Sequence, residues 1–135
     1  MKEDYVSFEI AKLLKEKGFP QTSIIGEFIT IMVYKVNEDD MHSLFYNYPG
    51  WMYNKDKYIA APTHQMAMAW LREKGIYINI FIDDDSEDPW TYNIFVRKDG
   101  KMTCAYHHHG RYFPLDGGYN IAPEEALKYC LENLI

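Results

Sequence analysis

Apolar residues recur at helical spacing in three segments of this chain, at about 8–17, 64–74 and from 123 onward. In each segment they fall on one side of a helix, which is the pattern of a helix packed on a core. The first two segments follow a residue that can cap a helix, Ser7 or Thr63, and each ends at a glycine, Gly18 or Gly75. Pro123 suits the first turn of the third. The pattern therefore predicts three helices.

Strict alternation of side chains, the pattern of a half-buried strand, is found at residues 76–82, 90–98 and 101–106. Asp99 and Gly100, between the last two segments, are a strong signal for a two-residue hairpin turn. After this turn, Met102, Cys104 and Tyr106 are expected on one face of the last strand. Three consecutive antiparallel strands are the simplest arrangement of these segments.

The remaining segments are less regular. Residues 24–36 predict one or two strands, and residues 58–60 predict a short one. The stretch 41–57 is interpreted as a long aromatic loop with a short helix at its start, and 107–120 as a second loop. We expect a single α+β domain over residues 1–135, with a mainly antiparallel three- to five-stranded sheet and three packed helices, in the order α-β-β-α-β-β-β-α.

Charge is concentrated in one place. The chain has 135 residues, enough to bury a sizeable core, and a net charge of -6. Five of the six residues from 83 to 88 are acidic. This stretch lacks the glycine and the distant glutamate of an EF-hand, so we expect a solvated hairpin loop and not a calcium site. No basic stripe is present, and binding to nucleic acid is therefore not expected.

The two cysteines, Cys104 and Cys130, have no CxxC partner. We expect two buried, reduced thiols, with a Cys104–Cys130 disulfide as the alternative. The first residues carry no secretory signal, and no apolar run is long enough to cross a membrane. We therefore expect a cytoplasmic protein with no membrane partner.

Aromatic residues are frequent, and 12 of the 135 residues are tyrosines. Aromatic side chains and an arginine gather in the two predicted loops, namely Tyr46, Tyr48, Trp51, Tyr53, Arg111, Tyr112 and Phe113. Tyr, Trp and Arg dominate the energetics of protein interfaces. Two main interpretations stay open. The loops pack down on the core, or they form an exposed surface for a protein partner or a second copy, with stacking of a small ligand or glycan as a further alternative.

Three consecutive histidines, 107–109, are the candidates for a metal site, because neutral imidazole binds Zn, Ni and Cu. Adjacent residues of an extended segment point in opposite directions, so only His107 and His109 can share a ligand set. A third ligand would come from elsewhere in the chain, from one of His64, Asp116 or His42. The alternative is a strand end with exposed histidines. No nucleophile or phosphate-binding motif is present, and no cofactor is expected.

Three segments of the chain are similar to one known family: YVSFEIAKLLKEKGF, APTHQMAMAWLREKGIYI and EEALKYCLENLI. They resemble a family of small proteins, without an assigned activity, that recurs in the genomes of gut bacteria and of their phages or mobile elements. The matching positions are helix caps and core residues, among them Ser7, Gly18, Trp70 and Leu131. The resemblance therefore implies a shared fold and carries no site residues.

Our first functional hypothesis is a non-enzymatic interaction or accessory protein of phage or mobile-element origin. It would bind a protein partner, or form a homodimer through its aromatic loops or an edge strand. The alternative is a small metal-dependent enzyme or metal-binding protein that uses the histidines at 107–109.

Overall fold

A computed structural model describes residues 5–21, 30–35, 44–49, 58–83 and 87–135. The chain divides into two compact units, residues 1–63 and 64–135, and each is described by itself below. The expectation of a single domain over residues 1–135 stays a prediction.

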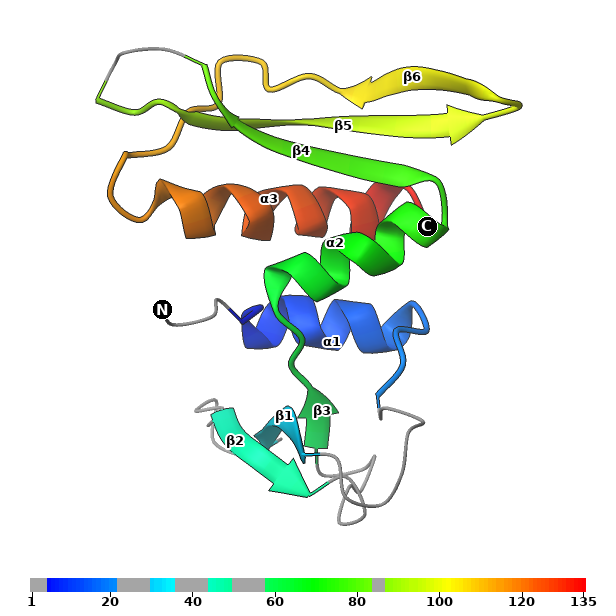
Figure 1. Ribbon diagram of the computed structural model, residues 1–135, viewed down its shortest axis with the longest axis vertical. Coiled ribbons are helices and arrows are strands. Elements are labelled where there is room, and N and C mark those ends of the chain that lie inside the picture. Colours follow the sequence, from blue (N-terminus) through cyan, green and yellow to red (C-terminus); the bar gives the residue numbers. More distant parts are fainter. Residues whose placement is uncertain (1–4, 22–29, 36–43, 50–57, 84–86) are drawn as a thin grey trace. The chain divides into compact units, whose positions relative to one another are not determined.

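The predicted α+β class and order of elements are confirmed (Figure 1). The elements are α1 (Phe8–Glu16), β1 (Thr30–Lys35), β2 (Leu44–Pro49), β3 (Tyr58–Ala60), α2 (His64–Glu73), β4 (Ile76–Ile82), β5 (Trp90–Lys98), β6 (Lys101–Tyr106) and α3 (Gly118–Asn133). The strands form two three-stranded antiparallel sheets, in the orders β2-β1-β3 and β4-β5-β6. The division into two sheets is a feature that the hydrophobic pattern did not indicate.

Helix α1 begins and ends as its sequence predicts. The Ser7 hydroxyl accepts a hydrogen bond from the Ile10 amide at 3.3 Å, which satisfies a free N–H of the first turn. At the other end Gly18 has a φ of 95°, and the Phe19 amide donates to the Leu14 carbonyl at 2.9 Å. This is the Schellman arrangement, which needs a residue without a Cβ at the left-handed position.

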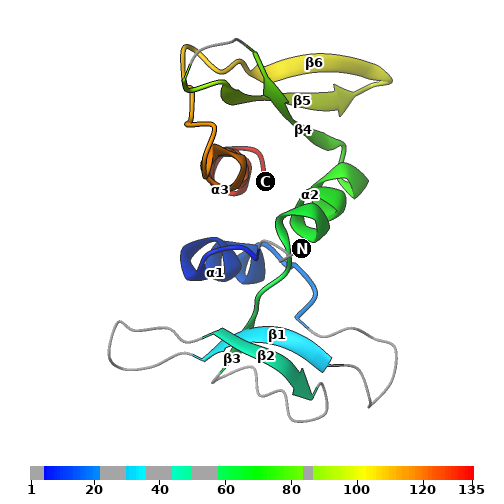
Figure 2. The same ribbon diagram turned by 60° about the vertical axis from the view of Figure 1, so that its left-hand side comes forward.

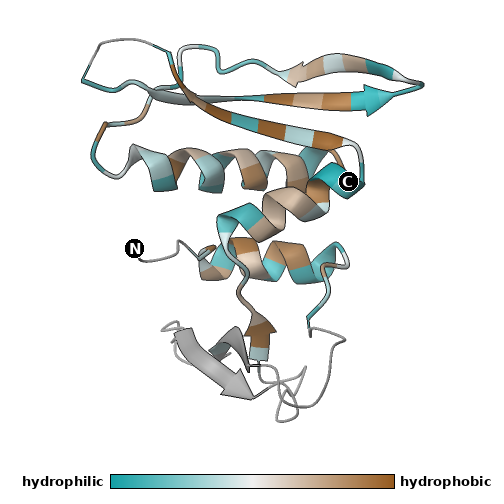
Figure 3. Ribbon diagram, in the orientation of Figure 1, coloured by the Kyte–Doolittle hydropathy of each residue, from teal (hydrophilic) through white to brown (hydrophobic). Residues whose placement is uncertain are grey.

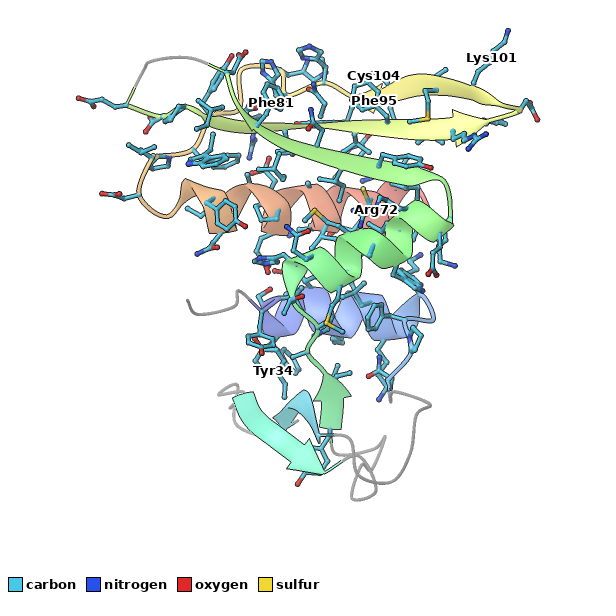
Figure 4. The ribbon with its side chains drawn as sticks, in the orientation of Figure 1. Tyr34, Arg72, Phe81, Phe95, Lys101 and Cys104 are labelled. Carbon is cyan, nitrogen blue, oxygen red and sulfur yellow. The ribbon has the colours of Figure 1, made fainter. Side chains whose placement is uncertain are left out.

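Helix α1 is tied to its sheet within the first unit. The Tyr34 hydroxyl donates to the Val6 carbonyl at 2.6 Å, and the Tyr34 ring lies edge-on to that of Phe8 (Figure 4). The Gln21 side chain accepts a hydrogen bond from the Ala60 amide of β3 at 2.9 Å. Side-chain and backbone bonds therefore hold the helix close to β1 and β3.

The aromatic stretch 41–57 differs from its prediction. Residues 44–49 form strand β2, which pairs with β1, where a loop with a short helix at its start was expected. Residues 41–43 and 50–57 lie outside the described part of the chain. Tyrosine and phenylalanine are favoured in strands, so these residues can form one when a partner strand is present. The irregular apolar pattern of this stretch does not indicate a strand by itself, and pairing with β1 provides the partner.

The second unit is built on the predicted meander. Ile76, Ile78 and Ile80 of β4 lie directly opposite residues of β5, and the apolar residues of β4 alternate with more polar ones in Figure 3. Asp99 and Gly100 have φ values of 53° and 77°, as a type I′ turn requires between β5 and β6. Helix α3 contacts β4 and β5, and helix α2 contacts β4, so both helices cover the same face of the sheet. The core of this unit lies between the sheet and the two helices. It contains Tyr92, Ile94, Leu127, Cys130 and Leu131.

Helix α3 begins at Gly118 and not near Pro123, which lies inside the helix. Two contacts hold this additional turn. A Cβ on Gly118 would come within 2.9 Å of Phe113, so the helix start approaches the preceding loop closely. The Tyr119 ring meets the Trp90 ring at a centroid distance of 5.5 Å. Tertiary packing therefore overrides the local signal of the proline.

A bulge in β6 corrects the expected placement of the cysteines. Cys104 lies opposite Phe95, whereas Tyr106 lies opposite Ile94, so the two β6 residues face opposite sides of the sheet. Tyr106 joins the helix-covered face and Cys104 is exposed. Both cysteines are free thiols, and only Cys130 is buried as expected.

Removing the buried side chain in Leu131→Ala should destabilise the protein by about 2–5 kcal/mol, because the side chain is fully buried and leaves a cavity. Glu132→Ala is the matched control, since Glu132 lies beside it on α3, is exposed and loses only a surface pair with Lys128, at a cost below about 1 kcal/mol. Urea unfolding measures both. Equal midpoints for the two variants would contradict the core described above.

We expect a thiol reagent to label one cysteine in the native protein and both after denaturation. Cys104 is exposed, whereas burial raises the pKa of the Cys130 thiol to about 12 and keeps it protonated and out of reach. Colorimetric thiol titration counts the reactive groups. Cys104→Ser should remove the native signal entirely, and two fast-reacting thiols in the native protein would contradict the placement of Cys130.

Candidate functional site

The loop of residues 107–117, here called the β6–α3 loop, carries most of the predicted site residues that the structure describes. Its backbone extends the sheet by one short pairing beside β5. The Trp90 amide donates to the Phe113 carbonyl at 3.2 Å, and the Phe113 amide donates to the Trp90 carbonyl at 2.8 Å. The Leu115 amide donates to the Glu87 carbonyl at 3.2 Å. These bonds fix the loop against the end of β5.

A polar cluster joins this loop to α3 and β5 on the helix-covered face. The Arg111 Nη2 atom lies 2.7 Å from Glu125 Oε2, and the Tyr92 hydroxyl donates to Glu125 Oε1 at 3.0 Å. From the other face of β5, the Thr91 hydroxyl donates to the Arg111 carbonyl at 2.7 Å. Both oxygens of one carboxylate are therefore engaged, each by a different part of the chain.

The protonation state of this cluster follows from its surroundings. Burial raises the pKa of Tyr92, and hydrogen bonds with Tyr106 and Glu125 raise it further. The Tyr92 ring stacks on that of Tyr106 at 5.3 Å, and the Tyr106 ring in turn contacts that of Tyr129 on α3 at 4.6 Å. Hydrogen bonding to Glu125 also raises the pKa of Arg111. Both groups keep their protons at neutral pH, so the cluster holds structure and offers no proton for exchange.

A second polar cluster lies on the opposite face of the sheet. The Tyr112 hydroxyl donates to Asp83 Oδ2 at 2.9 Å. His108 Nδ1 accepts from the Gly110 amide at 3.3 Å, so in a neutral ring the proton is on Nε2, which lies 3.9 Å from the same Asp83 oxygen. The His108 ring also meets that of Phe81 at 6.3 Å. This cluster ties the β6–α3 loop to the end of β4.

The structure does not bring a metal ligand set together around the predicted histidines. The rings of His107 and His109 lie 6.2 Å apart, and the His109 ring meets the edge of Tyr106. His64, a candidate third ligand, is bonded to Glu124 at 2.8 Å. Across residues 5–21, 30–35, 44–49, 58–83 and 87–135, no group of three His, Cys, Asp or Glu side chains is placed to hold a metal ion. His42 lies outside these ranges.

The predicted aromatic surface is present in part. Arg111 and Tyr112 are exposed, while Phe113 is half-buried and stacks on Tyr92. Tyr46 and Tyr48 lie on β2, where only the backbone is described, and Trp51 and Tyr53 lie outside the described residues. The predictions for these four side chains stay predictions.

A group of apolar side chains at the start of β5, three of them exposed, was not predicted as a site. We call Ile82, Trp90, Leu115 and Tyr119 the Trp90 cluster. Ile82 lies opposite Trp90 in the sheet, and Tyr119 contacts the Trp90 ring. The Leu115 amide donates to the carbonyl of Glu87, which precedes β5. Ile82, Leu115 and Tyr119 are 56%, 61% and 48% exposed. The Nε1 atom of Trp90 is buried and has no hydrogen-bond partner among the described residues.

Sequence reasoning missed this cluster because its two strand residues follow the ordinary alternation of a packed strand. Ile82 and Trp90 continue the faces of Ile80 and Tyr92, so the pattern assigned them to the core. Only the three-dimensional arrangement shows that Ile82 is left exposed. One sequence signal could have indicated this exposure. Ile82 ends one strand and Trp90 begins the next, directly beside the acidic stretch, and helices cover the ends of strands less than their centres.

Comparison of the chain with protein-family models, with curated proteins and with solved structures found no match. Among the helices of the described residues, none is both long enough and apolar enough to cross a membrane.

Glu125→Ala should lower the free energy of unfolding by about 1–3 kcal/mol, because the buried Tyr92 hydroxyl loses its acceptor and Arg111 loses its ion pair. Arg111→Ala is the comparison. It removes only the exposed partner, leaves the Tyr92 bond in place, and should lower the free energy of unfolding less than Glu125→Ala does. Urea unfolding of the two variants separates the buried bond from the exposed pair. A larger loss for Arg111→Ala would contradict this assignment.

Proposed function

We propose that this chain is a non-enzymatic interaction protein that binds a protein partner through the Trp90 cluster. The observation that carries the proposal is a group of three large apolar residues, each about half exposed or more, near one tryptophan. Tyr119 contacts the Trp90 ring, Ile82 lies opposite Trp90 in the sheet, and the Leu115 backbone is bonded to that of Glu87, just before β5. Soluble proteins seldom leave such groups in water unless they serve a contact. Tryptophan and tyrosine are also the residues that most often dominate interface energetics.

The charges around the cluster indicate the kind of partner. Asp83, Glu87, Asp88 and Asp116 are exposed at the same end of the sheet. An apolar centre with an acidic rim fits a segment that presents apolar anchors flanked by Lys or Arg. A second copy of this chain, docked through the same surface, would bring two acidic rims together. The geometry therefore supports a basic, amphipathic segment of another protein at this surface.

The polar clusters also support a non-enzymatic role. The Tyr92 phenol and the Arg111 guanidinium keep their protons, and Glu125 is engaged by both. These groups hold the β6–α3 loop in place, and with it Leu115, so the contact surface is preorganised. The resemblance to phage and mobile-element proteins fits the same proposal, since it would make the chain an accessory factor of such an element. No observation favours the metal-dependent alternative over this one.

A peptide-display library selected on the immobilised protein should yield binders rich in Lys or Arg and in large apolar residues. Leu115→Ser and Tyr119→Ser should each weaken a selected peptide by about tenfold or more, because each removes an anchor contact of roughly 1.4 kcal/mol. Calorimetric titration with the selected peptide gives the dissociation constants.

Ile135→Ser is the matched control for these variants, since Ile135 is another exposed apolar residue but lies at the end of the chain after α3. It should leave peptide binding unchanged. Acidic selected peptides, or binding that Leu115→Ser and Tyr119→Ser both leave intact, would rule out the Trp90 cluster as the contact surface.

A further inference from the structure

We propose that two copies of this chain associate through the free edge of β6, in an antiparallel pairing centred on Thr103. This surface is separate from the Trp90 cluster and does not depend on its proposed function. The partner is a second copy of the same chain, and the pairing would join two three-stranded sheets into one of six strands.

Strand β6 is an accessible edge of its sheet. It pairs with β5 on one side, and no strand of the described residues pairs with its other side. The first four residues of β6, Lys101 to Cys104, are all exposed. The helices of this unit lie mainly against β4 and β5, and α3 reaches β6 at Tyr106, whose ring contacts that of Tyr129. A strand edge left open in this way presents backbone N–H and C=O groups that another strand can bind.

The hairpin turn determines which backbone groups of β6 point outward. In a type I′ turn the Lys101 amide bonds back to the Lys98 carbonyl, and residues then alternate along the strand. Thr103 therefore bonds toward β5, where its hydroxyl also reaches the Val96 carbonyl at 3.4 Å. The backbone groups of Met102 and Cys104 point away from β5. These two residues supply the hydrogen bonds for a new strand.

Symmetry and the bulge together select the register. A two-fold axis at Thr103 pairs Met102 of one copy with Cys104 of the other, so all outward-pointing groups between them are satisfied. Lys101 then lies opposite Ala105, and no like charges face each other. The next symmetric register would use Tyr106, beyond the bulge that interrupts the regular strand after Cys104. In the register centred on Thr103, the new backbone hydrogen bonds come from Met102 and Cys104, and both residues precede the bulge.

Side chains support the same pairing. Met102 is 51% exposed and Cys104 is exposed, and by their register both share the face of Phe95. Cys104 and Phe95 are labelled in Figure 4. In the proposed register each Met102 packs against the Cys104 of the other copy. The pairing therefore covers apolar and weakly polar groups that the single chain leaves in water.

Charge along the sheet favours an antiparallel arrangement. Arg97, Lys98 and Lys101 flank the β5–β6 turn, which also contains Asp99, whereas Asp83, Glu87 and Asp88 lie at the opposite end, where β4 ends and β5 begins (Figures 1 and 2). An antiparallel pairing directs the basic turn of each copy toward the acidic end of the other. A parallel pairing would place like ends together. The charge distribution is thus complementary to its own copy in the proposed orientation.

The first test places a cysteine on the proposed axis. Thr103→Cys in a Cys104→Ser background should form a disulfide-linked dimer on mild oxidation, because non-hydrogen-bonded antiparallel pairs have Cα atoms about 4.5 Å apart. The wild-type chain should not link through Cys104, which faces Met102 in this register. Non-reducing electrophoresis distinguishes the two, and efficient linking through wild-type Cys104 instead would overturn the register.

The second test uses a charge exchange at the two facing positions. The double variant Met102→Lys with Cys104→Lys should be monomeric by light scattering, and so should Met102→Glu with Cys104→Glu, whereas their mixture should form a dimer. Both positions are exposed, so both variants should melt like the wild type. A wild-type protein that is monomeric into the high micromolar range would overturn the proposal, as would dimers that persist in both charged variants. Leu115→Ser with Tyr119→Ser should leave the dimer unchanged, which separates this result from peptide binding at the Trp90 cluster.

Discussion

The buried hydroxyl of Tyr92 is the constraint on which the arrangement of the second unit depends. A tyrosine with almost no exposed surface must give its hydroxyl a partner, since an unsatisfied buried donor costs about 1–3 kcal/mol. Glu125 on α3 supplies that partner, and its second oxygen binds Arg111 of the β6–α3 loop. Helix, sheet and loop are thus joined at one carboxylate. The loop then has a fixed path, and the positions of Tyr112 and Leu115 follow from it.

The elements whose character is local were predictable from the sequence. Ser7 and Gly18 delimit α1 because capping depends on the neighbouring backbone alone, and the alternation along β4 reflects a sheet face that helices cover over most of its length. The start of α3 was misplaced because Pro123 is a strong local signal. The additional turn is held by contacts with Phe113, in the preceding loop, and with Trp90, which is distant in sequence from the helix.

The bulge in β6 shows why the site could be predicted only in part. Met102, Cys104 and Tyr106 alternate perfectly in the sequence, yet the pairing with β5 places Tyr106 on the opposite face from Cys104. A pattern along one strand carries no information about the partner strand that produces a bulge. The same limit applies to Ile82 and Trp90. Their apolar character was evident, but the exposure of Ile82 depends on how far the helices and the β6–α3 loop extend over the sheet.

The two proposed surfaces are geometrically compatible, because they use different parts of the same sheet. The Trp90 cluster lies at the end where β5 begins, while the proposed pairing uses the outer edge of β6. A two-fold axis through Thr103 is perpendicular to the sheet, so both copies would turn their helix-covered faces to the same side. The dimer would then present two Trp90 clusters on one face. A target with two suitable basic segments would be held more tightly than by one cluster, because the second contact forms at a high effective concentration. Self-association at β6 would in this way increase the avidity of the interaction proposed for the Trp90 cluster.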